Sequence, residues 1–478
     1  IAAYDRTVNF YAERIESGTG TARYVLYPTP GFLTAVTVGD SPGRGSLTIT
    51  GPSISSSISG SSFFVSGSTL YEYPSTSRGT GIVNGADAPI VIVTNGDQGH
   101  QLLFASDSTT YAYDTTSHTL TSEGTGHAVA FLNSYGIRVN RNTNSFDFSA
   151  PFDFTSWDAL DTVAREDASD IWLTVLAYRE ELWLFGTETT SIYYNDADDA
   201  DTPWKPNESA FIQMGILSPY SVCIAGGAPM WLGQDAAGNS VVYRANGYTP
   251  VRVSTHAVEQ AIQSGVVGVA SLAEACTYQM NGHVFYELTL PSQDVEGGVI
   301  GSTWVYDVTE GLWHERGEWD ETQFQEMDTR GYFGGKSLSR SSGKVYSVIT
   351  DARSSSAWLS TSGTGQVRLR RAPHINQAQQ RIRYSHLRLL METGLGLGNV
   401  VEGAPGFDPE ITLSWSDDGG QTFGASYPVS AGQIGAFSTL VEWRQLGQAR
   451  DRIFELTCSA PVPWRLIDAF LDYSIGPS

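Results

Sequence analysis

Two glycine-containing strings have the spacing of catalytic or nucleotide-binding motifs. Residues 39–43 read G-D-S-P-G, which fits the G-x-S-x-G pattern of a serine nucleophile. In that pattern the residue after the serine donates a backbone N–H to the oxyanion, and Pro42 has no N–H to donate. Residues 334–337 read G-G-K-S, as at the end of a phosphate-binding loop, but Arg330 replaces the first glycine and the string at 341–343 interrupts the helix. We expect both strings to be turns.

The densest group of carboxylates lies between residues 195 and 201. Its four members are Asp196, Asp198, Asp199 and Asp201. Hard cations bind such oxygens, but the string lacks the glycine and the closing glutamate of a calcium-binding loop. We therefore expect a solvated acidic loop and no metal. In a ring of subunits the same loop would repel a polyanion.

A string near the C-terminus is the turn signature called an Asp-box. It reads S-x-D-x-G-x-T-F and is formed by Ser416, Asp418, Gly420, Thr422 and Phe423. In such a turn the polar side chains bond the backbone, the glycines take positive φ and the aromatic ring plugs the fold. Alone, the string predicts only a hairpin in a β-rich protein.

Six arginines near the Asp-box raise the possibility of a sialidase-like enzyme. They are Arg368, Arg370, Arg371, Arg381, Arg383 and Arg388. A sialidase binds a carboxylate with arginines, and a glycosidase also needs a pair of reacting groups at a defined separation, which sequence spacing does not fix. Sialidases usually carry several Asp-boxes, whereas this chain has one. We expect the arginines to form a polar face or a subunit contact, and the protein not to be an enzyme.

The histidines and cysteines give no sign of a metal or another cofactor. The eight histidines lack ligand spacing, and three cysteines, Cys223, Cys276 and Cys458, are widely separated. We expect buried free thiols, because each cysteine lies in an apolar run. No apolar run approaches the length of a membrane span, and the first residues do not form a signal peptide.

The net charge of −23 limits the partners of this protein. A static grip on nucleic acid needs clustered Lys and Arg, which the charge disfavours. A surface that repels phosphate would instead let DNA slide past without sticking. The competing interpretation is that the acidic surface only keeps the protein soluble.

The elements that position these strings are almost all short strands. The chain has 50 glycines, 12 tryptophans and 23 tyrosines, a composition typical of strands joined by tight turns. Groups of three or four strands recur with a period of roughly 40–50 residues, which is typical of propeller blades. About seven groups fit between Pro28 and Thr350. The sequence predicts an all-β protein with a β-propeller and loop insertions; a stack of sandwich domains is the competing fold.

A Ser/Thr/Gly-rich stretch predicts where the propeller ends. We expect a propeller over residues 1–353, a linker over 354–367 and a smaller C-terminal β-sandwich-like domain over 368–478. Helix signals are few: Ser254 and Thr255 are expected to cap a short helix that Gly265 stops. The Ser-rich residues 53–62 are predicted to be a loop.

Short blocks in a fixed order run along nearly the whole chain. Residues 8–13 (V-N-F-Y-A-E) precede P-T-P-G at 28–31, and the Asp-box precedes V-E-W-R-Q-L-G at 441–447 and R-D-R-I-F-E-L at 450–456. Further blocks occupy 156–160, 181–186, 215–221, 231–233, 243–248 and 253–256. Together they resemble the packaged-DNA stabilisation proteins of short-tailed bacteriophages, the tail hub or nozzle family. Residues 36–62 and 192–206 depart from that pattern, so partners there stay open.

The resemblance implies a structural virion protein. Members of that family form a hexameric ring beneath the portal and adaptor rings, extend the DNA channel and help to close it after packaging. They also carry other tail parts, such as the needle, fibres or tailspikes, while double-stranded DNA passes without sequence-specific binding. Candidate gate loops are residues 51–60, with Ser53 and Ser59, and residues 196–206. The alternative is a tail-associated propeller that binds or cleaves glycans.

Overall fold

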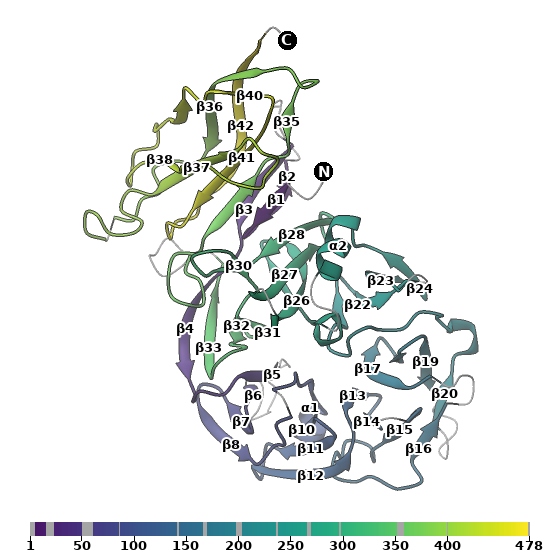
Figure 1. Ribbon diagram of the computed structural model, residues 1–478. Coiled ribbons are helices and arrows are strands. Elements are labelled where there is room, and N and C mark those ends of the chain that lie inside the picture. The colour runs from purple at the N-terminus through teal and green to yellow at the C-terminus, as the bar shows by residue number, and fades with distance from the viewer. Residues whose placement is uncertain are drawn as a thin grey trace.

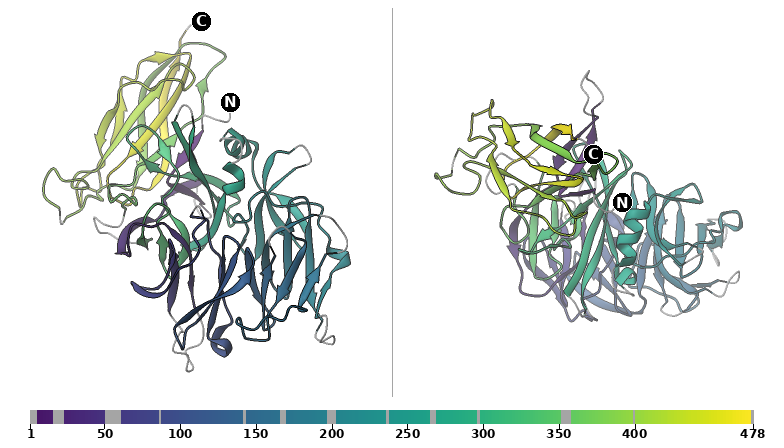
Figure 2. Two further views of the ribbon diagram at one scale, coloured as in Figure 1. Left: turned by 60° about the horizontal axis from the view of Figure 1, so that its bottom comes forward. Right: turned by 45° about the horizontal axis from the view of Figure 1, so that its top comes forward.

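The computed structural model contains a ring of small sheets and a second β body joined to one side of it (Figure 1). It describes residues 5–15, 23–49, 61–85, 87–140, 143–165, 170–196, 203–235, 238–264, 269–295, 298–350, 358–398 and 400–476. Both views in Figure 2 keep the second body beside the ring.

The ring consists of four-stranded antiparallel blades that follow one another along the chain. Blade one is β5 (Gly43–Thr48), β6 (Ser62–Ser66), β7 (Thr69–Glu72) and β8 (Thr76–Thr80). Blade two is β9 (Ile92–Thr94), β10 (Gln101–Ser106), β11 (Thr109–Asp114) and β12 (Thr119–Thr125). Blade three is β13 (Ala128–Leu132), β14 (Tyr135–Val139), β15 (Ser145–Phe148) and β16 (Thr162–Ala164). Blade four is β17 (Trp172–Tyr178), β18 (Glu181–Gly186), β19 (Thr190–Asn195) and β20 (Trp204–Pro206).

Three further blades complete the ring. Blade five is β21 (Cys223–Ala225), β22 (Ala228–Gln234), β23 (Ser240–Asn246) and β24 (Thr249–Arg252). Blade six is β25 (Glu274–Met280), β26 (His283–Val295), β27 (Gly298–Asp307) and β28 (Leu312–Arg316). Blade seven joins β31 (Arg330–Phe333), β32 (Lys336–Leu338) and β33 (Lys344–Ile349) to the early strand β4 (Gly31–Thr37). The predicted propeller of about seven blades is therefore confirmed over the described residues.

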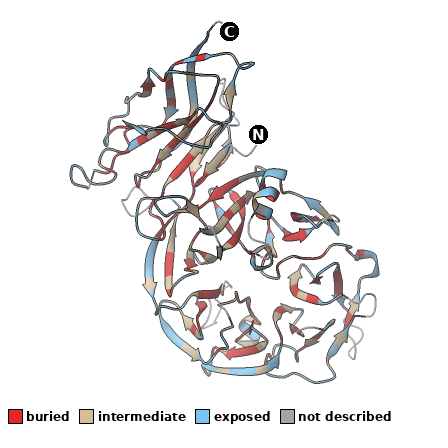
Figure 3. Cartoon of the chain, viewed as in Figure 1, coloured by how far each residue is buried: buried red, intermediate tan, exposed pale blue. Residues whose placement is uncertain are grey.

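The blades hold together because both faces of each are apolar. One core cluster joins blades one and two, through residues such as Phe63 and Phe104, and another joins blades four and five through Trp183 and Trp231. Side chains on successive positions are buried for this reason, whereas the outermost strands are exposed (Figure 3). Aromatic side chains such as these fill the space between neighbouring blades.

Insertions between blades are short. Among the described residues they are η2 (Glu208–Ala210), α2 (His256–Ser264), η3 (Val269–Leu272) and the hairpin of β29 (Glu318–Trp319) and β30 (Phe324–Gln325), whereas α1 (Gly96–Gly99) lies within blade two, between β9 and β10. Helix α2 follows Thr255 as predicted, and the Thr255 carbonyl accepts the first helical bond from the Glu259 N–H.

The second body is a sandwich of two antiparallel sheets. Its first sheet orders β1 (Arg6–Val8), β34 (Arg368–Arg371), β41 (Asp451–Cys458), β37 (Glu410–Ser416) and β38 (Tyr427–Ser430), with β35 (Ile375–Asn376) beside β41. Its second sheet orders β2 (Phe10–Arg14), β3 (Tyr24–Pro28), β42 (Leu466–Ile475), β36 (Ile382–Met391) and β39 (Val441–Arg444), with β40 (Gln448–Ala449) beside β36. One apolar core fills the space between the sheets.

The first strands of the chain pair with the last ones. Strand β1 lies antiparallel to β34 and parallel to β28, so one ten-stranded sheet runs from blade six into the sandwich. Strand β3 meets β42 at the pair Leu26 and Leu466. The division of the chain at residues 353 and 368 stays a prediction, and this pairing adds that the segment before β4 contributes strands to the C-terminal body.

Gly45 tests how closely neighbouring blades approach near the axis. A Cβ at Gly45 would lie 2.0 Å from the Ile90 carbonyl oxygen, whereas at Gly424 the nearest atom would be 3.6 Å away. We expect Gly45→Ala to lower the free energy of unfolding by about 1–3 kcal/mol, because the backbone must shift. Gly424→Ala is the control and should change it little. Equal thermal unfolding midpoints for the two variants would contradict the close packing.

Candidate functional site: the propeller–sandwich junction

Asn9 turns the chain from one sheet of the sandwich into the other. It lies between β1 and β2, is fully buried and has a φ of 60°. Its side-chain amide donates to the Gly317 carbonyl at 2.8 Å and to the Val367 carbonyl at 2.7 Å, and its Oδ1 accepts from the Gly317 N–H at 3.1 Å. Asparagine tolerates the left-handed conformation, and here its amide also binds blade six to the start of the sandwich.

The P-T-P-G string carries the chain from the sandwich into blade seven. The Thr29 N–H donates to the Asn9 carbonyl at 3.1 Å, and the Phe32 N–H donates to the Leu359 carbonyl at 2.9 Å. Thr29 is fully buried, and the Pro30 carbonyl accepts from the Arg316 guanidinium at 3.2 Å. Backbone groups of a non-repetitive segment are therefore satisfied inside the protein, as burial requires.

A buried ion pair lies directly beneath this segment. Arg316 of β28 and Glu287 of β26 are both almost fully buried, with Nη1 and Oε2 2.7 Å apart. Tyr332 of blade seven shares the pair, because Arg316 Nη1 donates to its hydroxyl at 2.8 Å. Burial alone lowers the pKa of the Arg316 guanidinium, but the neighbouring Tyr332, Tyr278 and Glu287 outweigh burial and raise that pKa. Arg316 is therefore charged and joins blades six and seven to the entering chain.

Two more arginines close the junction. Arg6 of β1 binds Glu315 of β28 through two bonds of 2.6 Å, and its guanidinium lies 5.3 Å from the centre of the Phe324 ring in the inserted hairpin. Arg368, fully buried, donates to the carbonyls of Val462 and Ala460. Carbonyl dipoles thus replace the carboxylate that a buried guanidinium usually needs, and burial lowers the pKa of Arg368.

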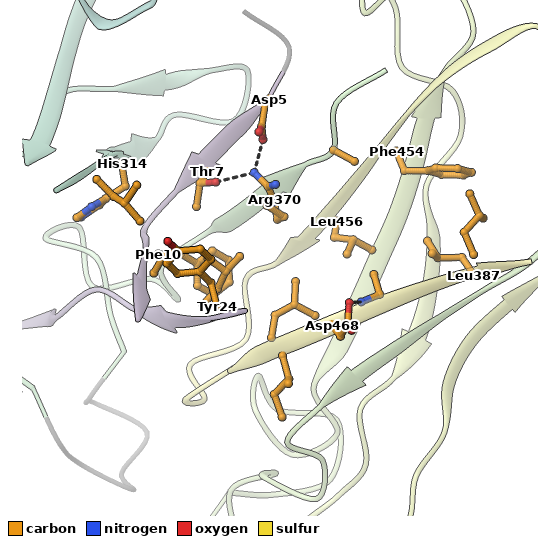
Figure 4. A pocket seen from close by; sticks show the side chains of 18 of the residues that line it. Asp5, Thr7, Phe10, Tyr24, His314, Arg370, Leu387, Phe454, Leu456 and Asp468 are labelled. Atoms are coloured by element: carbon orange, nitrogen blue, oxygen red, sulfur yellow. Dashed lines mark hydrogen bonds and ion pairs between the residues drawn. The ribbon is translucent and has the colours of Figure 1, made fainter. Parts of the chain in front are cut away.

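An apolar cleft of about 630 Å³ opens where the junction meets β42 (Figure 4). Phe10, Leu387, Phe454 and Leu456 are among the residues that line it, and Arg370 at its rim binds Asp5 and donates to Thr7 at 2.8 Å. His314 lines the same cleft, and burial, with Arg316 and His283 nearby, lowers the pKa of its imidazole to about 3. This side chain is therefore neutral at physiological pH.

The Asp-box forms a turn in the sandwich, between β37 and β38. Asp418 accepts from the Ser416 hydroxyl at 2.7 Å, from the Thr422 hydroxyl at 2.6 Å and from the Thr422 N–H at 3.0 Å, and these bonds hold the pKa of its carboxyl well below the usual range. Gly420 has a φ of 88°. Phe423 is half-buried beneath the Arg371 guanidinium, 4.4 Å from the ring centre, so the ring packs against this arginine and not in the deep core.

The predicted gate residues fall mostly on parts of the chain for which no structure is described. Asp196 lies at the end of β19, where its carboxylate pairs with Lys205 at 2.5 Å. Asp198, Asp199, Asp201, Ser53 and Ser59 lie outside the described residues. A gate formed by these two loops stays a prediction.

The strings that resembled catalytic motifs are turns. The Ser41 and Pro42 carbonyls accept bonds from Ser66 and Gly67 of the neighbouring hairpin. Gly334 and Gly335, with φ of 51° and 72°, form the tight turn between β31 and β32. Over the described ranges, no cluster of three or more His, Cys, Asp or Glu could hold a metal ion. Nor does any helix in this part of the chain have the length and apolarity to cross a membrane.

The six arginines considered for a sialidase-like site are spread over both sheets of the sandwich. Arg368 is buried in the junction, Arg370 and Arg371 pair with Asp5 and Glu455, and Arg388 pairs with Glu442. Arg381 and Arg383 are exposed at one end of β36. Most of them serve the sandwich itself, which the sequence did not reveal, because the partner of each comes from a distant strand.

The fold and the junction together define a class of protein: an all-β protein whose propeller and sandwich share one continuous sheet. A family model described as bacteriophage P22 Gp10, beta-propeller, matches residues 8–332, and one described as bacteriophage P22 Gp10, beta-sandwich, matches residues 368–472. The chain therefore belongs to the bacteriophage P22 Gp10 family, whose members are phage tail structural proteins. The resemblance found in the sequence is confirmed.

Comparisons with other proteins give the fold no further support. No curated protein sequence matches the chain. Two solved structures that resemble it are extracellular domains of BT4673 from B. thetaiotaomicron, described as a hybrid two component system and as a one component system. They share 9% identity each, with TM-scores of 0.42 and 0.40, and cover 74% and 92% of this chain. The chain spans 42% and 62% of their lengths, less than two thirds of either.

Asn9 offers a direct test of the junction. Asn9→Gly keeps the positive φ but removes the three side-chain bonds, so we expect it to lower the free energy of unfolding by about 1–3 kcal/mol. Asn9→Asp should cost more, because a buried carboxylate would face two carbonyl oxygens. Asn133, exposed with a φ of 48° in the turn after β13, is the matched control. Urea unfolding of both pairs of variants checks this, and equal effects at Asn9 and Asn133 would refute the role of Asn9.

The buried pair gives a second test. Glu287→Gln leaves Arg316 charged without its carboxylate, and we expect a loss of about 3–5 kcal/mol in unfolding free energy. The matched control is Glu392→Gln, which breaks a pair with Arg465 in which both side chains are more than a third exposed. That change should stay below about 1 kcal/mol. Similar urea midpoints for the two variants would show that Glu287 does not hold the charge of Arg316.

Proposed function

We propose that this chain is the subunit of a phage tail hub, or nozzle. Six copies form a ring beneath the portal and adaptor rings, extend the DNA channel, help to close it after packaging and let DNA pass on ejection. The ring also carries neighbouring tail parts, such as a needle, fibres or tailspikes. The protein acts in the virion after assembly in the host cytoplasm.

The observation that carries the proposal is the continuous sheet through β1. A channel segment that retains a pressurised genome must transmit force between its parts without hinging. Backbone hydrogen bonds join blade six to β1 and β1 to β34, so the two bodies are connected by sheet and not by a single linker. The buried Asn9 amide and the Arg316 pair reinforce the same place. These features suit a protein that must transmit force between its two bodies.

The distribution of charge supports the passage of DNA. Residues 368–478 contain ten arginines and eleven carboxylates, a net charge of −1, whereas the whole chain carries −23. The excess of 22 negative charges therefore lies in residues 1–367, mostly the propeller. Phosphate is repelled by such a surface, which favours sliding over binding. The ring geometry that would place this surface around a lumen is part of the proposal.

A phage that lacks this gene provides the test. We expect its particles to package DNA but to lose it, measured as DNA accessible to nuclease, and we expect complementation by the wild-type gene to restore retention. In-frame deletion of 51–60 or of 196–206 then tests each gate loop, because a deletion that leaves retention unchanged excludes that loop. Electron microscopy of the purified protein should show six-fold rings.

Two outcomes would overturn the proposal. One is full retention of DNA in particles that lack the protein. The other is the release of sugars from host polysaccharide by the purified protein, which would favour the glycan-cleaving alternative. Binding of the polysaccharide without cleavage or ring formation would favour the glycan-binding alternative.

A further inference from the structure

We propose that the sandwich of one copy inserts an apolar loop into the cleft beside β42 of the next copy. The loop is residues 432–440, between β38 and β39, and the cleft is the one lined by Leu387, Phe454 and Leu456. This inference rests on the proposed ring, and it names the contact that would link one subunit to its neighbour.

The loop presents apolar side chains to solvent in a fixed arrangement. Ile434, Phe437 and Leu440 are 64%, 73% and 55% exposed. The backbone around them is held by hydrogen bonds, from Thr393 Oγ1 to the Phe437 carbonyl at 2.9 Å and from the Gly435 N–H to the Gly394 carbonyl at 3.2 Å. An ordered loop that exposes three large apolar side chains is typical of an interaction surface.

The cleft offers a complementary surface. Its volume of about 630 Å³ accommodates several side chains, and its walls are largely apolar. Among the described strands, β42 pairs with β3 at the single position Leu466, so from residue 467 to its end it pairs only with β36. An exposed strand edge beside an apolar cleft is a common docking site for an extended segment.

The electrostatics favour the same pairing. No Asp, Glu, Lys, Arg or His occurs between positions 424 and 441, so the loop is uncharged. At the rim of the cleft Asp5 and Arg370 neutralise each other. Because the sandwich carries −1 and the rest of the chain −22, two copies repel each other least where their sandwiches meet.

The positions of loop and cleft determine the kind of assembly. Within the sandwich, β1 and β38 are the outermost strands of the first sheet, and β2 and β39 are the outermost strands of the second. The cleft adjoins β1 and β2, and the loop joins β38 to β39. With the loop on one side of the sandwich and the cleft on the other, each copy contacts the next in a head-to-tail manner. Such contacts generate a closed ring when the rotation between successive copies adds up to a full turn.

Cysteine cross-linking of the full-length protein tests the contact. Phe437→Cys places a thiol on the loop and Ala469→Cys places one in the cleft, where Ala469 is exposed. Under an oxidant that forms disulfides, a mixture of the two single variants should give cross-linked dimers, and neither variant alone should. Phe470→Cys is the matched control, because Phe470 pairs with the exposed Arg388 on the opposite face of β42. Burial raises the pKa of the three native thiols, which keeps them slow to react.

Ring assembly provides the second measurement. We expect Phe437→Asp to raise the protein concentration needed for rings by about tenfold or more, whereas Leu160→Asp, at a more exposed apolar side chain of the propeller, should leave it unchanged. Rings without the mixed cross-link overturn this contact and leave the tail hub proposal intact. A mixed cross-link in open chains supports the contact and contradicts the ring. If neither rings nor the mixed cross-link form at high protein concentration, both the contact and the tail hub proposal are overturned.

Discussion

The structure depends on one short strand having two neighbours that belong to different bodies. Strand β1 is three residues long, yet it pairs with β28 of the propeller on one edge and with β34 of the sandwich on the other. Such a strand holds its place only if the chain can leave it sharply, and Asn9, at positive φ with its amide bonded to both sides, provides that turn. The Arg6–Glu315 and Arg316–Glu287 pairs stabilise the two ends of the same connection.

The propeller could be predicted from the sequence because its signals are local. Each blade is a run of adjacent hairpins, so the period of apolar strands and glycine turns records the blades directly. The pairing of β1 with β34 and of β4 with β33 has no comparable signal in the sequence, because the partners are more than three hundred residues apart and the strands are short. The N-x-Y and P-T-P-G strings marked this region as notable, but only the fold shows that Asn9 and Thr29 meet.

The chemistry of the side chains was predictable to a smaller extent. Turn residues such as Asp418 and Gly334 follow local rules, and the structure places both in turns. The roles of the arginines do not follow from local rules. A guanidinium serves equally well on a surface, in a buried ion pair or against carbonyl groups, and its partner determines which of these environments it occupies. Arg368 and Arg383 stand two strands apart in the sequence; one is fully buried and the other exposed. The net charge of the whole chain likewise does not show that the sandwich is nearly neutral and the propeller acidic.

The closure of blade seven by β4 has a consequence for biosynthesis. The first strands are made early, but their partners β33, β34 and β42 are made more than three hundred residues later. Blades one to six can form as hairpins during translation, whereas the ring and the sandwich must wait for the C-terminal residues. Until then the apolar faces of blades one and six that pack against blade seven stay uncovered, which exposes the nascent chain to association with other copies. Synthesis of β33, β34 and β42 is thus itself the step that seals the fold.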